Sequence, residues 1–208
     1  YKELKNKTEN TIITLLFIVI PMVFGLSVLA SPVWNIFYGV NKLGVSVFSV
    51  SIFTALFCSL FNIVIIIMQS VNRYKKVYLC LVLGILTKII INVPMMLLFD
   101  KIGLNAYWGA SISTMLGYVI SLIVCFIDLK KQFNINVKEI LKSAFLSLIA
   151  AVIMFVVIYM LSHYINFGTS RFMSILEVIL YVIIGIIIYG GILFKTKTFK
   201  KILSNFRR

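Results

Sequence analysis

The sequence has few of the residues that catalysis and metal binding require. Its 208 residues include one histidine and six acidic residues. It contains no Ser/His/Asp set, no His/Cys/Asp cluster and no glycine-rich phosphate loop. The three cysteines lie in apolar stretches, without metal-ligand spacing or a pairing pattern, and we interpret them as core residues. We therefore expect no enzyme, no metal and no other cofactor.

Charge is also scarce, because charged residues make up 12% of the chain and apolar residues 62%, in long runs. In a soluble protein a net charge of +14 would suggest nucleic acid. Here the basic residues lie between and after the apolar runs, so membrane topology and anionic membrane lipids explain them better, and we expect no nucleic-acid partner. The composition predicts an all-α, polytopic helical membrane protein.

The apolar runs predict six transmembrane helices, each long enough to cross about 30 Å of hydrocarbon. They cover residues 11–31, 45–69, 77–99, 104–127, 143–163 and 174–194. Four of the segments outside them hold sixteen of the 20 Lys and Arg residues, and the three alternate connections hold one each. Both ends are therefore expected in the cytoplasm. Because the chain begins without Met or a signal peptide, we expect a part of a longer polypeptide.

This topology divides the chain into five segments. They are a cytoplasmic N-terminal segment (1–10), four transmembrane helices (11–127), a cytoplasmic loop (128–142), two peripheral transmembrane helices (143–194) and a basic cytoplasmic tail (195–208). In the tail, apolar residues lie at helical spacing among basic residues: Phe199, Ile202, Leu203 and Phe206. This pattern predicts an amphipathic helix on the anionic lipids of the inner leaflet.

A single lysine lies in the middle of the third span. Lys88 is about 11 residues, or roughly 16 Å, from Val77, which places it close to the midplane. A lysine there costs about 2.5–3.5 kcal/mol, so it should face the bundle interior or a wet cavity. Gly84 and Asn92 share its helix face at i, i+4. The face predicts a site for a polar, anionic group, and the structural alternative is a snorkelling lysine or one with a single buried partner.

Two spans contain a proline in their interior. Pro21, followed by Gly25, marks a kink or hinge in the first span. Pro94 has no backbone N–H, so it should kink the third span and free the carbonyl of Ile90.

The second span carries small and polar residues at helical spacing: Ser51, Ala55, Cys58, Asn62 and Gln69. Such a stripe faces other helices or a cavity. Helix packing explains the smaller members, whereas both interpretations stay open for Asn62 and Gln69.

The fourth span has a small residue at every fourth position: Gly109, Ser113, Gly117 and Ser121. This spacing lets two helix backbones approach closely. The short connection from Asp100 to Gly103 makes the third and fourth spans a hairpin, so this face should border the Lys88 face. Thr114 stands beside it and can offer its hydroxyl to a cavity.

Two patterns predict helix ends. Pro32 and Gly39 should end the first span and form a turn. Ser174 and Glu177 have the spacing of a capping box, which predicts a helix start at Ser174.

Several of these segments also match a known pattern in their order. They are Pro21-x3-Gly25-x6-Pro32-x6-Gly39, then MQSVNRYKK over 68–76, then Lys88-x3-Asn92-x-Pro94, then YWGASIST over 107–114. Together they resemble the C-terminal half of the multidrug/oligosaccharidyl-lipid/polysaccharide flippase superfamily. The third is similar to the branch that holds stage V sporulation protein B and MurJ-like lipid II flippases. Asn72 stands where the family's cytoplasmic turn usually has glycine.

The resemblance implies that the six spans are the last six of fourteen helices in a two-lobed, MATE-like fold that works by alternating access. It further implies export of a polyprenyl-pyrophosphate-linked sugar, such as lipid II or a polysaccharide repeat unit, across the cytoplasmic (plasma) membrane. The last two helices would form a lipid-side groove, and the N-terminal lobe of the same polypeptide would be the partner. Lys88, Asn92, Gln69 and Thr114 are then the candidates for lining the substrate cavity.

Two other functions stay open. A multidrug or organic-cation antiporter of the same superfamily would need a buried carboxylate, and no acidic residue lies at mid-depth in these spans. A non-transporting scaffold of cell-wall assembly would leave Lys88 at the midplane unexplained.

Overall fold

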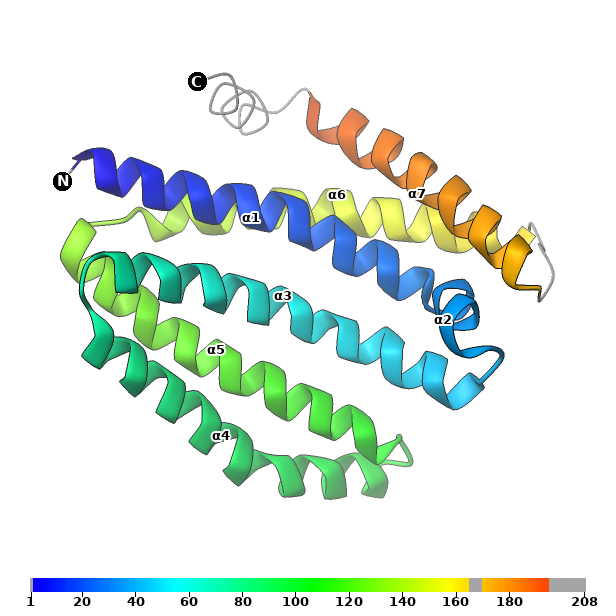
Figure 1. The fold of residues 1–208 in the computed structure, drawn as a ribbon, viewed down its shortest axis with the longest axis horizontal. Helices are drawn as coiled ribbons and strands as arrows, with labels where there is room; N and C mark the ends of the chain where they lie inside the picture. The colour runs from blue at the N-terminus through cyan, green and yellow to red at the C-terminus, as the bar shows by residue number, and fades with distance from the viewer. Residues whose placement is uncertain (1, 165–169, 195–208) are drawn as a thin grey trace. The chain divides into compact units, whose positions relative to one another are not determined.

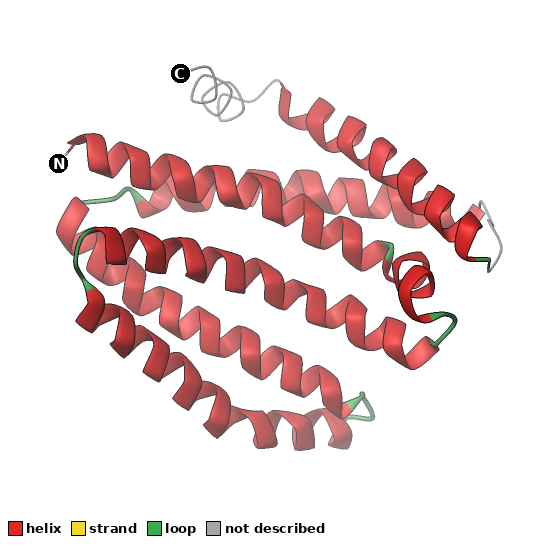
Figure 2. Ribbon diagram, viewed as in Figure 1, coloured by secondary structure: helices red, strands yellow, loops and turns green. Residues whose placement is uncertain are grey.

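A computed structural model describes residues 2–164 and 170–194. Its helices, labelled in Figure 1, are α1 (Lys2–Val28), α2 (Ala30–Tyr38), α3 (Lys42–Ser70), α4 (Tyr74–Lys101), α5 (Ala106–Phe133), α6 (Val137–Tyr164) and α7 (Arg171–Phe194). Figure 2 shows no strand in the described ranges. Within these two ranges, six helices are long and apolar enough to cross a membrane, which confirms the all-α, six-span prediction. The tail 195–208 and its predicted amphipathic helix lie outside the described residues.

The chain forms two compact units. The first contains Tyr1–Leu16 and Phe53–Leu141, and the second contains Phe17–Ile52 and Lys142–Arg208. In the first unit α4 and α5 lie side by side as an antiparallel pair (Figure 1). Gly103 makes the turn between them with a φ of 79°, a conformation that glycine adopts without steric cost. In the second unit α2 packs against α7.

The helices extend beyond the apolar segments that predicted them. Residues 128–142, predicted as a cytoplasmic loop, are mostly helical, because α5 continues to Phe133 and α6 begins at Val137. The charged end of α5 stops at Asn134, which adopts left-handed angles (φ 51°, ψ 43°). Hydropathy marks the part of a helix that lies in lipid, whereas the helix itself ends where a residue such as Asn134 can leave it.

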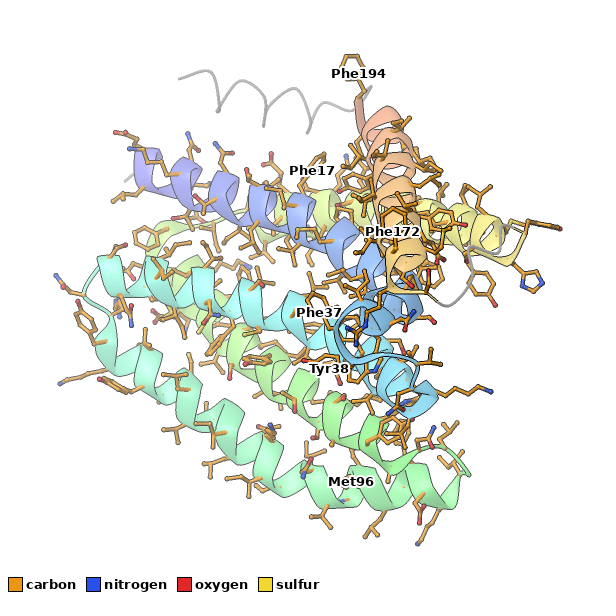
Figure 3. The ribbon with its side chains drawn as sticks, turned by 45° about the vertical axis from the view of Figure 1, so that its right-hand side comes forward. Phe17, Phe37, Tyr38, Met96, Phe172 and Phe194 are labelled. Atoms are coloured by element: carbon orange, nitrogen blue, oxygen red, sulfur yellow. The ribbon has the colours of Figure 1, made fainter. Side chains whose placement is uncertain are left out.

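The first predicted span is two helices in the structure. α1 ends at Val28, and Pro32 lies in the first turn of α2, where its missing N–H has no intrahelical acceptor to lose. Pro32 therefore begins a helix, and the prediction that it ends one was wrong. Gly39, with a φ of 79°, ends α2. Figure 3 shows Phe37 and Tyr38 at the end of α2, where they are 70% and 73% exposed.

α7 begins earlier than the capping-box pattern predicted. Its first helical residue is Arg171, and the Oγ of Ser170 accepts a hydrogen bond from the N–H of Met173 at 3.3 Å. Ser174 is buried inside the helix, and its Oγ accepts a hydrogen bond from Asn35 Nδ2 of α2 at 2.8 Å. The capping-box interpretation was wrong, because the helix begins at Arg171 and the Ser174 side chain bonds to α2 and not to the N-terminus of α7.

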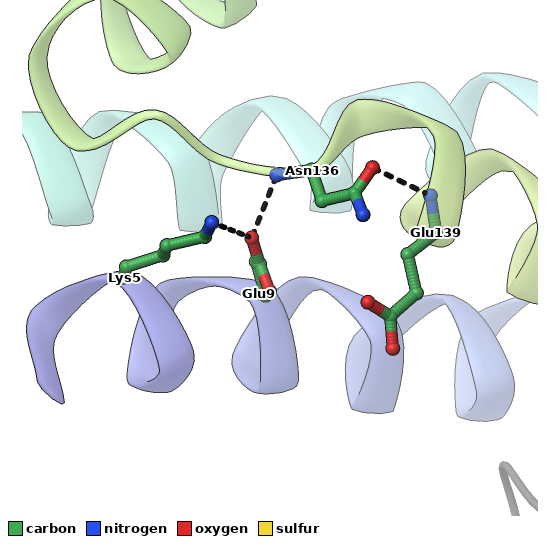
Figure 4. A network of polar contacts seen from close by, with 4 residues as sticks. All are labelled: Lys5, Glu9, Asn136 and Glu139. Atoms are coloured by element: carbon green, nitrogen blue, oxygen red, sulfur yellow. Dashed lines mark hydrogen bonds and ion pairs between the residues drawn. The ribbon is translucent and has the colours of Figure 1, made fainter. Parts of the chain in front are cut away.

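A buried carboxylate connects α1 to the start of α6 within the first unit. Glu9 is 4% exposed, and its Oε1 accepts a hydrogen bond from the N–H of Asn136 at 2.6 Å (Figure 4). Lys5 Nζ lies 4.0 Å from the same oxygen. The Oδ1 of Asn136 in turn accepts from the N–H of Glu139 at 3.4 Å. The first turn of α6 is thus anchored to the beginning of the chain.

The turn between α3 and α4 depends on a left-handed asparagine. Asn72 has a φ of 60°. Its N–H donates to the carbonyl of Gln69 at 3.0 Å, and the N–H of Arg73 donates to the carbonyl of Met68 at 2.9 Å, so two of the last carbonyls of α3 are satisfied. Asparagine tolerates this conformation better than other residues with a side chain, which explains how it replaces glycine.

Candidate functional site

The site begins with a close approach of two helices in the first unit. A Cβ built on Gly117 of α5 would lie 2.8 Å from the carbonyl oxygen of Gly84 in α4. A Cβ on Gly109 would lie 2.6 Å from the carbonyl oxygen of Met95. All four small residues of the α5 stripe are buried: Gly109, Ser113, Gly117 and Ser121. Glycine at these positions lets the two backbones touch.

Two serines of the stripe form hydrogen bonds across the same interface. Ser113 Oγ donates to Asn92 Oδ1 at 2.9 Å, and Ser121 Oγ donates to the backbone carbonyl of Cys80 at 2.8 Å. The α5 stripe and the face that carries Lys88 therefore border each other, which confirms that expectation from the hairpin.

A hollow of about 310 Å³ opens beside this interface, between α3, α4 and α5. Its polar lining residues are Asn62, Lys88, Thr114, Tyr118 and Ser121. Apolar residues of the three helices, such as Phe61 and Leu81, complete it. An apolar hollow with a few polar groups, one of them a cation, is the usual form of a ligand site.

Lys88 is the charged residue of this lining. Its side chain is exposed on this chain, and its Cβ lies 3.6 Å from the position that a Cβ on Gly117 would occupy. The absence of a side chain at Gly117 thus makes room for the start of the lysine side chain. The ion pairs found between described residues are Lys5–Glu9, Lys7–Glu3 and Arg73–Asp128, none of which involves Lys88. Its three N–H donors can therefore serve an anion.

Two lining residues were missed or left undecided by sequence reasoning. Tyr118 was not singled out, and Asn62 was left between packing and a cavity. The hydroxyl of Tyr118 lies 3.4 Å and the Nδ2 of Asn62 3.5 Å from the same atom, Cys58 Sγ. Tyr118 follows Thr114 by four residues, and this i, i+4 spacing was the signal that could have identified it.

The four cavity candidates are only partly brought together. Lys88 and Thr114 both line the hollow, although the Thr114 hydroxyl donates to the carbonyl of Ala110 at 2.9 Å. Asn92 lies one turn beyond Lys88 and accepts the hydrogen bond of Ser113 instead. Gln69 is exposed at the end of α3, seven residues or about 10 Å along the helix from Asn62. Gln69 is therefore not part of this lining.

Both helices that were predicted to kink contain a proline in their interior. Pro94 lies inside α4, which changes direction along its length in Figure 1. Pro21 and Gly25 lie inside α1 and line a second hollow, of about 420 Å³, in the second unit. α6 and α7 complete this hollow with apolar and aromatic residues, among them Met154, Tyr181 and Tyr189. This apolar lining would accommodate a hydrocarbon chain.

Within residues 2–164 and 170–194, no group of three or more His, Cys, Asp or Glu side chains is placed to hold a metal ion.

Comparisons with known proteins agree with this architecture. A family model described as lipid II flippase MurJ matches residues 1–190. The lipid II flippase MurJ of Bacillus subtilis (strain 168) is 29% identical over 197 residues, which are 91% of this chain and 35% of the relative. A solved structure of lipid II flippase MurJ in an inward closed conformation has the same fold, with a TM-score of 0.69 at 17% identity over 92% of this chain and 40% of that chain. The chain thus spans about a third of its curated relative, and it belongs to the MurJ lipid II flippase family.

Proposed function

We propose that this chain is part of a flippase that carries a polyprenyl-pyrophosphate-linked sugar across the plasma membrane by alternating access. The family match and the name of the Bacillus subtilis relative make lipid II the first substrate to test. They favour a lipid flippase over the antiporter and the scaffold that the sequence left open.

One observation carries the proposal: Lys88, in the middle of a helix long and apolar enough to span the membrane, lines a largely apolar hollow that contains a few polar groups. A lysine at this depth is costly unless a cavity or a counter-charge compensates it. A pyrophosphate supplies that counter-charge, and two opposite charges attract strongly where water is scarce. Asn62 adds an amide to the same hollow. We assign the pyrophosphate end of the substrate to this hollow.

The second hollow fits the other end of such a substrate. A polyprenyl chain is apolar, and the hollow between α1, α6 and α7 is lined by apolar and aromatic side chains. This assignment agrees with the lipid-side groove that the resemblance implied for the last two helices.

The proposal includes a topology with both ends in the cytoplasm. It is supported by the basic residues near one set of helix ends, such as Lys5, Lys76 and Lys130. Single cysteines introduced at Lys76 and Lys101 should react with an impermeant thiol reagent from opposite sides of the membrane.

The decisive experiment is native mass spectrometry of the full-length protein with lipid II or undecaprenyl-pyrophosphate-linked sugars. Lys88→Ala should weaken binding of these lipids, and Lys88→Arg should keep most of it, because the positive charge remains. Lys101→Ala is the matched control, since Lys101 is the last residue of the same helix. Equal binding by wild type and Lys88→Ala would return Lys88 to a structural role. Absence of binding by wild type would favour the antiporter or the scaffold.

A further inference from the structure

Three helices of the second unit meet at one tyrosine hydroxyl. The hydroxyl of Tyr189 in α7 donates to the backbone carbonyl oxygen of Phe17 in α1 at 2.8 Å. Its oxygen also lies 2.5 Å from Ser147 Oγ in α6. Tyr189 is 8% and Ser147 1% exposed, so the cluster is buried between the helices.

The sequence explains why the Phe17 carbonyl needs an outside partner. In an α-helix the carbonyl of residue 17 accepts from the N–H of residue 21. Residue 21 is a proline inside α1 and has no N–H to donate. In lipid an unsatisfied carbonyl costs several kcal/mol, and prolines are tolerated there when neighbouring helices satisfy the freed group. Tyr189 supplies that donor.

Proton counting sets the direction of the two hydrogen bonds. A tyrosine hydroxyl has one proton, which goes to Phe17, so the bond to Ser147 must use the serine proton. The order is therefore Ser147 to Tyr189 to the Phe17 carbonyl. The rings of Phe17 and Tyr189 also meet edge to face, with centroids 5.4 Å apart.

We propose that Tyr189 is a positioning residue: its hydroxyl replaces the N–H that Pro21 lacks and thereby fixes α7 against α1. Phe17, Pro21 and Tyr189 all line the hollow of about 420 Å³, so this hydrogen bond sets the position of one wall. The structural role of Tyr189 does not depend on the proposed function. Only the transport measurement below rests on it.

A double-mutant cycle in the full-length protein tests the inference. Tyr189→Phe removes the hydroxyl and keeps the ring. Pro21→Ala restores an N–H that can satisfy the Phe17 carbonyl within α1. In the proline background, Tyr189→Phe should lower the ratio of folded to unfolded protein by roughly three- to eighteen-fold, which are the average and the maximum for hydrogen bonds between membrane helices. In the alanine background the same change should have little effect. An equal effect in both backgrounds would overturn the inference.

Tyr181→Phe is the control, because it removes a hydroxyl from the same helix and the same hollow but leaves the bond to Phe17 intact. It should show no dependence on Pro21, and a dependence equal to that of Tyr189 would contradict the assignment. The rate of lipid II transport should follow the same cycle, with Pro21→Ala rescuing Tyr189→Phe. If the effects of Tyr189→Phe and Pro21→Ala on stability are coupled but the protein transports no lipid-linked sugar, the proposed function is rejected. The role of Tyr189 in positioning α7 is then still supported.

Discussion

Gly84 and Gly117 face each other across α4 and α5 at a distance that leaves no room for a side chain on either. A Cβ on Gly84 would overlap Ser121 Oγ and lie 3.1 Å from the carbonyl oxygen of Gly117. Both glycines also line the hollow that contains Lys88. The approach of the two backbones therefore determines both the stability of the helix pair and the width of the site.

Replacing Gly117 by alanine should destabilise the protein although alanine is the better helix former. Alanine gains about 1 kcal/mol in helix propensity. The clash with the Gly84 carbonyl costs about 1–3 kcal/mol in a packed interface, so the net change should be unfavourable. Thermal unfolding of the purified protein measures it. Gly191→Ala is the matched control, since a Cβ at Gly191 meets nothing within 4 Å. A Gly117→Ala protein that melts at or above the wild-type temperature would refute this packing argument.

The hydrogen bond between Ser113 and Asn92 should be measurable as a pairwise coupling. Hydrogen bonds between membrane helices contribute about 0.6 kcal/mol on average and up to about 1.7 kcal/mol. Ser113→Ala, Asn92→Ala and the double variant give this coupling through their free energies of unfolding. We expect a value in that range. Additive effects of the two changes would show that the bond contributes nothing.

The two ion pairs at the start of α1 should differ in importance. Glu9 is buried and accepts from the N–H of Asn136, so Glu9→Ala should cost about 1.5–3 kcal/mol of unfolding free energy. Glu3 pairs with Lys7 in an exposed position, where the side chains are 81% and 74% accessible. Glu3→Ala should therefore change stability much less than Glu9→Ala does, because water screens an exposed ion pair. Hydrogen exchange at the first turn of α6 should rise in the Glu9 variant alone, and unchanged exchange would count against the anchor.

The turn at Asn72 should accept glycine and reject β-branched residues. Asn72→Gly keeps the left-handed conformation accessible and should be nearly neutral. Asn72→Val should lose about 1–2 kcal/mol, because a Cβ branch is disfavoured at a φ of 60°. Chemical denaturation in detergent compares the two. Equal stability of the glycine and valine variants would mean that this φ does not limit the turn.

Hydropathy predicted the six membrane helices because a run of about 20 apolar residues is what a helix needs to cross the hydrocarbon core. It did not predict the break at Val28, since residues on both sides of it are apolar, and the nearby signal, Pro32, was interpreted as the end of a helix when it marks the first turn of α2. It also missed the helical ends around Asn134, because polar residues continue a helix outside the bilayer as well as they form a loop.

The site was predicted in part for a similar reason. Lys88 stood out because its charge conflicts with its depth, and the α5 stripe followed from its spacing. Gln69 was included because it continues the polar stripe of its helix at helical spacing, although two helical turns separate it from the hollow. Tyr118 and Tyr189 were overlooked because an aromatic residue in an apolar run resembles core. The partner of Tyr189 is a backbone carbonyl, which no side-chain pattern reveals.

The contact between Glu9 and Asn136 has a consequence for biosynthesis. The two residues are 127 positions apart, and the ribosome adds about 5–20 residues per second. Asn136 is thus synthesised roughly 6–25 s after Glu9, and the hydrogen bond between them cannot form before then. The first unit can therefore form its Glu9 anchor only after the start of α6 has been synthesised.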